Sequence, residues 1–201
     1  MHFLPSEFGG NRRLSLKPAR SGSRRAASGF TLVELLAVIA IVTILLTIGV
    51  PSFKYINTSY RVSGEANGLL GDLQFARVEA IREGQTVTVC VSSDGANCSA
   101  TSTWQSGWIV FSDPNGNQAV DPGETVLRIQ PPFTGTDTLA PSAVLEAVTF
   151  NREGFAQNLP GAGVTLVLHD ATANSIWTRC LTMTIIGHTT VQNPQTSAAC
   201  L

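Results

Sequence analysis

An acidic residue lies inside an apolar run near the N-terminus, shortly after a Gly-Phe pair. Glu34 is the only charged residue from Phe30 to Phe53, and a carboxylate at membrane depth costs about 3 kcal/mol unless it meets a partner. If the peptide bond after Gly29 is cut, the new amino group of Phe30 lies one helical turn from Glu34 and can supply that partner, within the chain or in a neighbouring one. The spacing therefore predicts a processing site whose product forms an ion pair.

A second candidate site is the segment from Asp113 to Glu124, which has the oxygen spacing of a calcium-binding loop. The residues at the ligand positions are Asp113, Asn115, Asn117, Asp121 and Glu124. The position that needs a sharp turn, and normally has Gly, is Gln118. Calcium binding is one interpretation. A hairpin connection rich in Asn, Gly and Pro is the other, and it is favoured because β-type segments rather than helices flank the loop.

The sequence contains no arrangement of residues typical of an active site. It has no Ser/His/Asp or Cys/His motif, no phosphate-binding glycine loop and no metal-hydrolase helix. The three histidines, His2, His169 and His188, lack the spacing of metal ligands. We therefore predict a protein that is not an enzyme and needs no cofactor, with calcium as the one possible exception.

The charge balance of the chain changes from basic to acidic after Gly29. Residues 1–29 hold six basic residues and one acid among Ser, Gly and Ala, whereas the remaining chain has seven basic and thirteen acidic residues. The first segment is typical of a targeting leader. By the positive-inside rule, it stays in the cytoplasm and the remainder faces the periplasm. The dispersed Lys and Arg residues of the acidic remainder do not form the basic patch expected for nucleic-acid binding.

The elements that position these residues follow from two different periodicities. Residues 30–53 are long enough to cross a bilayer as a helix. Residues 54–84 continue it with an apolar stripe of Ala66, Leu69, Leu73, Ala76 and Ala80, widened by Leu70 and Ile81; Pro51 is expected to kink the helix and Gly84 to end it. From residue 85 to 201, short β-branched runs predict antiparallel strands at 87–91, 108–111, 126–129, 144–150, 164–169 and 180–186. Gln130 to Pro141 is expected to be an exposed loop.

The junction at Gly29 resembles the type III signal sequence of type IV pilins and secretion pseudopilins, through Gly29, Phe30, Thr31, Leu32, Glu34 and Pro51. The β-rich region resembles the GspH/FimT family of minor pilins and pseudopilins. The residues that carry this second resemblance are Val89-Cys90, Cys98, Trp104, Gly107-Trp108, Phe111, Asp113, Asn115, Asp121, Glu124, Phe150 to Gly154, and Arg179-Cys180 to Cys200.

The resemblance implies an α+β, pilin-like fold in which a long N-terminal helix packs on an antiparallel β-sheet domain. It also implies cleavage between Gly29 and Phe30 by a prepilin peptidase, N-methylation of Phe30 and a role of Glu34 in assembly. The partners would be other pilins or pseudopilins in a filament that starts at the bacterial inner membrane. The host machine would be a type IV pilus or a type II secretion system, with this chain at the tip or as a minor component.

Four cysteines in a periplasmic domain are expected to be oxidised. Three pairings are possible. We favour Cys90 with Cys98, which closes a short polar loop, and Cys180 with Cys200, which ties the C-terminal end to a strand.

A DNA-binding minor pilin, used in natural transformation, is the alternative function. Such relatives have a Gly-Arg-x-Arg segment near the C-terminal strand, and the matching stretch here is Gly187-His188-Thr189-Thr190. His188 is then the residue that could contact DNA. Because both arginine positions hold other residues, we predict a structural subunit for which DNA is not a partner.

Overall fold

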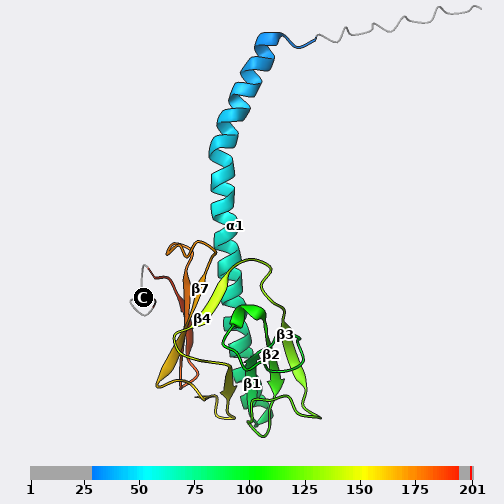
Figure 1. Ribbon diagram of the computed structural model, residues 1–201, viewed down its shortest axis with the longest axis vertical. Helices are drawn as coiled ribbons and strands as arrows, with labels where there is room; N and C mark the ends of the chain where they lie inside the picture. The colour runs from blue at the N-terminus through cyan, green and yellow to red at the C-terminus, as the bar shows by residue number, and fades with distance from the viewer. Residues whose placement is uncertain (1–28, 195–199, 201) are drawn as a thin grey trace, which may run out of the picture. The chain divides into compact units, whose positions relative to one another are not determined.

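The computed structural model describes residues 29–194 and residue 200 (Figure 1). The expected leader, residues 1–29, lies outside the described residues except for Gly29. The chain divides into two compact units, the first ending at Leu45 and the second beginning at Leu46. Each unit is described by itself.

A single helix, α1 (Leu32–Glu83), contributes to both units. In the part that the structure describes, α1 is long and apolar enough to cross a membrane. The helix continues through Pro51. Thr43, a polar residue of the apolar run, donates its hydroxyl to the carbonyls of Ile39 and Ala40, both at 2.8 Å. This local bonding satisfies a hydroxyl that lipid could not.

In the second unit, one stripe of α1 is buried against the β-strands. Its members are Val62, Ala66, Leu69, Leu73, Ala76 and Ala80, which alternate at spacings of four and three residues and therefore share one helix face. Five of the six were predicted from the sequence. Ile81, which was expected to widen the stripe, is instead about half exposed. Three of the six are alanines, which let the helix backbone approach the sheets closely.

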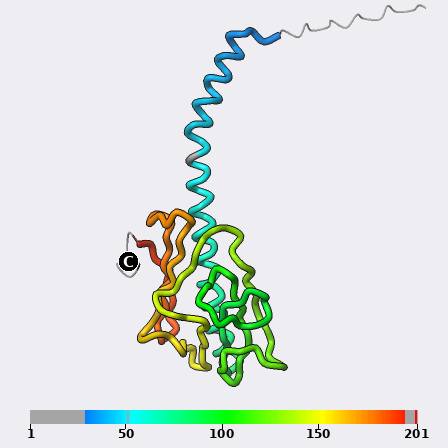
Figure 2. Tube along the Cα trace, in the orientation of Figure 1, coloured from blue at the N-terminus to red at the C-terminus, as the bar shows by residue number. Residues whose placement is uncertain are grey.

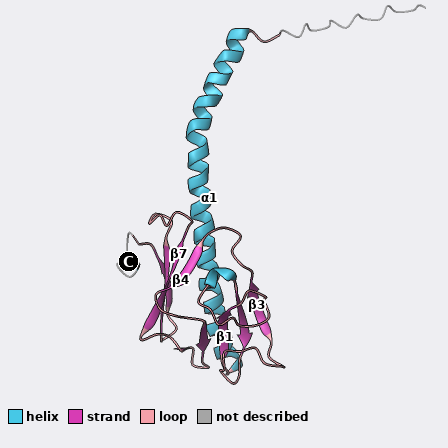
Figure 3. Cartoon of the chain, viewed as in Figure 1, coloured by secondary structure: helices cyan, strands magenta, loops and turns pink. Residues whose placement is uncertain are grey.

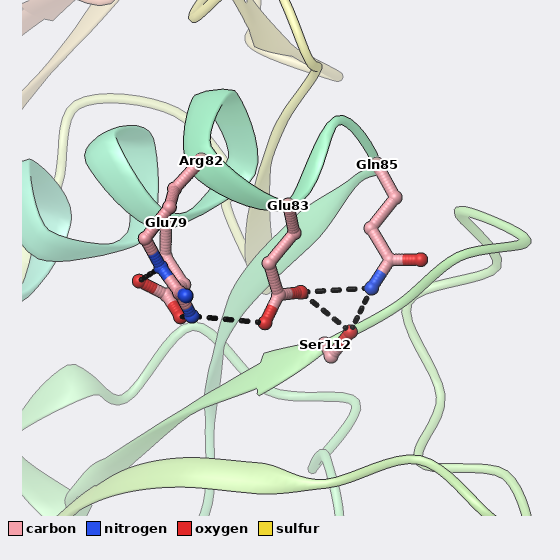
Figure 4. Close-up of polar contacts among 5 residues, drawn as sticks. All are labelled: Glu79, Arg82, Glu83, Gln85 and Ser112. Carbon is pink, nitrogen blue, oxygen red and sulfur yellow. Dashed lines mark hydrogen bonds and ion pairs between the residues drawn. The ribbon is translucent and has the colours of Figure 1, made fainter.

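The C-terminal end of α1 is closed by a glycine and a polar network. Gly84 has φ +69° and donates its N–H to the carbonyl of Ala80 at 3.0 Å, which is the left-handed stop that Gly makes at low cost. Gln85 donates to Glu83 Oε2 and to Ser112 Oγ, both at 2.8 Å (Figure 4). Arg82 pairs with Glu79 and lowers the pKa of that carboxyl. The network fastens the end of α1 to the β-domain at Ser112.

In the described part of the chain, nine strands form two antiparallel sheets, and Figure 3 draws the strands in magenta. The first sheet has the order β3-β2-β1-β5-β6, with β1 (Val87–Val91), β2 (Trp108–Ser112), β3 (Val126–Gln130), β5 (Ala147–Phe150) and β6 (Ala156–Gln157). The second has the order β4-β7-β8-β9, with β4 (Thr138–Pro141), β7 (Gly163–His169), β8 (Arg179–Thr184) and β9 (Thr189–Gln192). A short 3₁₀ helix, η1 (Trp104–Ser106), precedes β2. The predicted fold class is thus confirmed.

The strand prediction was wrong around β4 and β5, did not include β6 or β9, and extended β8 past its end at Thr184. Thr138–Pro141, expected within an exposed loop, is strand β4, and its Leu139 is buried. The strand expected from Val144 starts only at Ala147. β4 is a short edge strand that contains a proline and buries a single apolar side chain, so it lacks the alternation by which strands are recognised.

Both sheets and α1 contribute side chains to one main core. Two tryptophans of this core donate hydrogen bonds, one to α1 and one to the connection between β4 and β5. Trp108 donates its indole N–H to Asp72 of α1 at 2.9 Å, and Trp104 donates to the carbonyl of Leu145 at 2.9 Å. Asp72 also pairs with Arg128 of β3 at 2.9 Å. These bonds satisfy buried polar atoms and fix which face of α1 meets the first sheet.

Candidate assembly site

The predicted processing and assembly segment comes just before α1 and in its first turn. Gly29, Phe30 and Thr31 precede the helix, and Glu34 is its third residue. Phe30 is 82% exposed. The backbone N–H of Glu34 donates to Thr31 Oγ1 at 3.2 Å, and the N–H of Leu35 donates to the Thr31 carbonyl at 3.1 Å. The chain at the Gly29–Phe30 bond is thus outside the helix and accessible.

Thr31 is the N-cap of α1, and Glu34 occupies the third helical position. Thr-x-x-Glu is the sequence of a capping box. The positive end of the helix dipole also favours a carboxylate in the first turn. The sequence-based expectation covered only the ion pair of Glu34 with Phe30, although the Thr31–Glu34 spacing also signals the cap. Glu34 therefore has a stabilising neighbourhood before any cleavage occurs.

The described part of the first unit exposes apolar side chains along α1. Leu32, Val33, Leu35, Leu36, Val38, Ile39, Ile41, Val42, Ile44 and Leu45 are all exposed. A continuous apolar surface of this kind is unfavourable in water and marks a membrane or protein contact.

The calcium-like loop is held by hydrogen bonds to its own oxygens. Asp113 is fully buried, and its carboxylate accepts from Thr88 Oγ1 at 2.7 Å and from the N–H groups of Asn117 and Gln118. Gln118 has φ +63°, so it adopts the left-handed turn at the position where glycine was expected. The structure thus places the five predicted residues in one turn-rich connection between β2 and β3.

The remaining ligand positions bond to one another. Asn115 and Asn117 donate their side-chain amides to Asp121 at 2.8 and 2.7 Å, and Glu124 accepts from the N–H of Asp121 at 2.9 Å. Within residues 29–194 and 200, no group of three or more His, Cys, Asp or Glu side chains is arranged to hold a metal ion. The loop can therefore connect the strands without a cation.

His188, the candidate DNA contact, lies in the β8–β9 turn and is exposed. Its neighbours Ile185 and Ile186 are also exposed. Arg77 of α1 donates to the carbonyl of Gly187 at 2.9 Å, so this cation ties the backbone of the turn to the helix. The outer surface of this turn is apolar where DNA-binding relatives would be basic.

The two disulfides join Cys90 to Cys98 and Cys180 to Cys200, which is the pairing favoured from the sequence. Cys90 lies on β1, with its side chain among Ile109 and Phe111. Cys180 is buried on β8. Each disulfide thus links a buried strand residue to a cysteine outside the strands.

A buried acidic pair beside Arg61 could not be found from sequence spacing. Arg61 of α1 donates to both carboxylate oxygens of Asp137, each at 2.7 Å, and the Asp137 side chain is fully buried. Burial, together with the neighbouring Asp137 carboxylate, raises the pKa of Glu65 to about 7. Glu65 Oε2 is buried without a hydrogen-bond partner among the described residues. These residues are far apart in sequence and meet only when α1 packs against the chain before β4.

Comparison with known proteins connects both parts of the chain to one group. Residues 24–50 match the prokaryotic N-terminal methylation motif, and residues 65–187 match the family described as Type II transport protein GspH. The pilin-like protein PilA1 of Thermus thermophilus is 33% identical over 96 residues, which are 48% of this chain and 54% of that protein. The chain therefore spans about half the length of this curated relative.

The solved structure of a minor pilin shows the same fold. The crystal structure of the type IV minor pilin FimU of Pseudomonas aeruginosa superposes with a TM-score of 0.55 at 18% identity, over 74% of this chain and 99% of that one. The minor pseudopilin EpsH of the Vibrio cholerae type 2 secretion system gives 0.47 at 13% identity, over 67% of this chain and 98% of that one.

The resemblance drawn from the residues is confirmed. With the methylation motif at the helix start and the family match across the β-domain, the chain belongs to the GspH family of minor pilins and pseudopilins, structural subunits of type IV pili or type II secretion systems.

Proposed function

We propose that this chain is a structural filament subunit, cut between Gly29 and Phe30 by a prepilin peptidase and methylated on the amine of Phe30. It then enters the filament through α1, as a minor component or at the tip. Before assembly it is held in the bacterial inner membrane with its N-terminus in the cytoplasm and its β-domain in the periplasm.

The arrangement at the start of α1 carries this proposal. The Gly29–Phe30 bond lies outside the helix, and Glu34 lies one turn further on in the first helical turn. Cleavage would place a cationic amine next to a carboxylate that is otherwise surrounded by apolar residues. If the ion pair forms between neighbouring chains, it selects one axial register of subunits, because any other register leaves both charges unpaired at membrane depth.

The β8–β9 turn supports a structural role over DNA uptake. The turn exposes Ile185 and Ile186, and its nearby cation Arg77 bonds to the backbone. DNA affinity depends on cations that neutralise phosphates, and this surface presents none beyond His188 in its charged form. We therefore propose that the domain contacts other proteins of the filament and does not bind DNA.

Intact-mass analysis tests the processing step. The full chain is expressed in bacterial cells with an active prepilin peptidase, and a strain with an inactive peptidase is the matched control. Loss of residues 1–29 together with the gain of one methyl group is expected only in the first strain. Full-length protein in both strains would overturn the proposal.

A further inference from the structure

The connection between β7 and β8 contacts α1 just beyond its apolar run. The rings of Trp177 and Tyr55 pack with centroids 5.7 Å apart and planes tilted by 57°. Tyr55 follows Phe53, the last residue of the expected membrane span, by two positions. Figure 2 shows the connection, coloured orange, beside the helix within the second unit. An aromatic pair therefore lies where the β-domain begins and the span ends.

This end of the domain presents exposed aromatic and aliphatic side chains together. Tyr60 is 76% exposed, and the other exposed members are Phe53, Tyr55, Ile56 and Ile176. A groove of about 260 Å³ is lined by Tyr55, Ile56, Ser59 and Tyr60. Tyrosine and tryptophan concentrate at membrane–water interfaces, because each has an apolar ring and a polar end. We call this set, with Trp177, the aromatic end.

The loop that presents Ile176 and Trp177 is ordered by its own hydrogen bonds. The Asp170 carboxylate accepts from Thr172 Oγ1 at 2.6 Å and from the N–H of Asn174 at 3.0 Å. Asn174 Oδ1 accepts from the N–H of Ile176, and its carbonyl accepts from that of Trp177, both at 3.0 Å. The two apolar residues are thus held at the tip by a defined turn.

The charges at this end suit an anionic surface. Its two acids are buried: Asp137 is paired with Arg61, and Asp170 is used by the loop. The charged side chains left at least partly exposed in residues 52–62, 131–137 and 170–179 are Lys54, Arg61 and Arg179. Because Arg61 is paired with Asp137, Lys54 and Arg179 are the cations left at this end, in contrast to the acidic balance of the chain after residue 29. Basic residues near a bilayer are attracted to anionic lipids.

The indole N–H of Trp177 adds a separate observation. Trp177 Nε1 is buried and has no hydrogen-bond partner among the described residues. A buried donor without a partner costs free energy. The phosphate and ester oxygens of lipid headgroups are hydrogen-bond acceptors of the kind that this donor lacks.

We propose that the aromatic end rests in the headgroup region of an anionic bilayer, so that the unassembled subunit holds its β-domain against the membrane surface. The bilayer is the occupant because the patch is continuous with the apolar, exposed residues Ile48, Val50 and Phe53 of the span and has the matching charge. Release of this contact would then accompany entry into the filament. The inference requires membrane anchoring and does not depend on which machine uses the subunit.

Fluorescence quenching by lipid tests the proposal on the full-length chain. The protein is reconstituted at low protein-to-lipid ratio in vesicles of phosphatidylethanolamine and phosphatidylglycerol, with acyl chains brominated near the headgroup or unbrominated. Trp104 and Trp108 are only 1% exposed and serve as internal references. Brominated lipid is expected to quench the wild type, and Trp177→Phe is expected to lower the quenched fraction at least threefold.

A second pair of variants keeps the test independent of Trp177. Ile176→Glu should lower the quenched fraction at least twofold, while Val144→Glu, the same change at an exposed residue of the β4–β5 connection, should leave it unchanged. Equal quenching of wild type and Trp177→Phe would overturn the proposal. A different outcome is quenching, or a shift of the tryptophan emission, that appears only when the protein-to-lipid ratio is raised. It would show that the aromatic end contacts a second subunit, and it would overturn the bilayer proposal. Vesicle flotation separates these outcomes from failed insertion.

Discussion

The backbone N–H of Glu34 donates to Thr31 Oγ1 at 3.2 Å, so the residue proposed to direct assembly is also the third residue of a capped helix. The cap uses the backbone N–H of Glu34 and the side chain of Thr31, whereas assembly is proposed to use the Glu34 carboxylate. The cap stabilises the first turn by about 1 kcal/mol, whereas the charge serves a partner that exists only after cleavage. Substitutions that keep one function and remove the other can separate them.

Replacing Glu34 should impair assembly without preventing membrane insertion. Glu34→Gln retains a residue that a capping box accepts but removes the charge, and Glu34→Ala removes both. We expect both variants to insert as well as the wild type, because an apolar span without a charge is easier to insert. Recovery with filament partners in a pull-down should fall at least tenfold for both.

Thr31→Ala is the matched control, because it removes the cap hydroxyl and keeps the charge. Its recovery should stay within about twofold of the wild type, since a long membrane helix tolerates the loss of about 1 kcal/mol at its end. Normal recovery of Glu34→Gln would contradict the ion-pair role and leave capping as the function of Glu34.

Glu65 should make the β-domain less stable as the pH rises toward 8. Its pKa is raised from 4.5 to about 7 in the folded protein, mainly by burial and then by the Asp137 carboxylate. Its stabilising contribution is therefore complete below about pH 4.5 and is lost as the pH rises through about 7. We expect Glu65→Gln to match the wild type near pH 4.5 and to be more stable by about 1–2 kcal/mol at pH 8, a value reduced for partial solvent screening.

Thermal unfolding of the detergent-solubilised chain across this pH range measures the effect. Glu79→Gln is a control of opposite sign, because Arg82 lowers the pKa of Glu79. The contribution of Glu79 is present above its unfolded pKa and is lost on acidification, so this variant should lose stability at neutral pH. A pH profile unchanged by Glu65→Gln would show that Glu65 titrates normally.

Removing either disulfide should destabilise the β-domain. The pair Cys180–Cys200 spans 20 residues and Cys90–Cys98 spans 8, so loop-closure entropy predicts about 3 and about 2.5 kcal/mol. Double Cys→Ser variants, compared by thermal unfolding without reductant, should show both losses, with the larger one for Cys180 and Cys200. Non-reducing peptide mapping that links Cys90 to Cys180 or Cys200 would contradict this pairing.

The chain should bind DNA only weakly. In a gel-shift titration at neutral pH and physiological salt, we expect a Kd weaker than about 10⁻⁶ M, the range of non-specific binding. His188→Ala should leave it unchanged. The double variant His188→Arg and Thr190→Arg restores the cations found in DNA-binding relatives and should tighten binding at least tenfold. Submicromolar binding abolished by His188→Ala would favour the DNA-uptake function.

Calcium should have little effect on stability, although the loop has the required spacing. Asp113 is buried and already accepts from Thr88, Asn117 and Gln118, and Asp121 accepts from two asparagine amides. We expect millimolar Ca²⁺ to leave the unfolding temperature unchanged relative to EDTA. A rise of several degrees that Asp121→Asn removes would assign a calcium site to this loop.

Parts of this protein follow from local patterns in the sequence. Glu34 and its apolar surroundings predicted the membrane helix, because charge and hydropathy need no tertiary context. The alternating stripe from Ala66 to Ala80 predicted the packing face for the same reason. The strands β1, β2, β3, β7 and β8 were found because each has a run of β-branched or aromatic residues between turn residues.

Tertiary structure decided the features that depend on contacts between distant residues. The edge strand β4 exists because β7 pairs with it and because Leu139 is buried, and its own sequence is short and contains a proline, so it does not signal a strand. Arg61 meets Asp137, and Tyr55 meets Trp177, across separations of 76 and 122 residues. Sequence determined which segments form helix and strands, because that choice is largely local. Tertiary packing decided which charges and aromatic rings share a surface, because it brings together residues that have no regular spacing in the sequence.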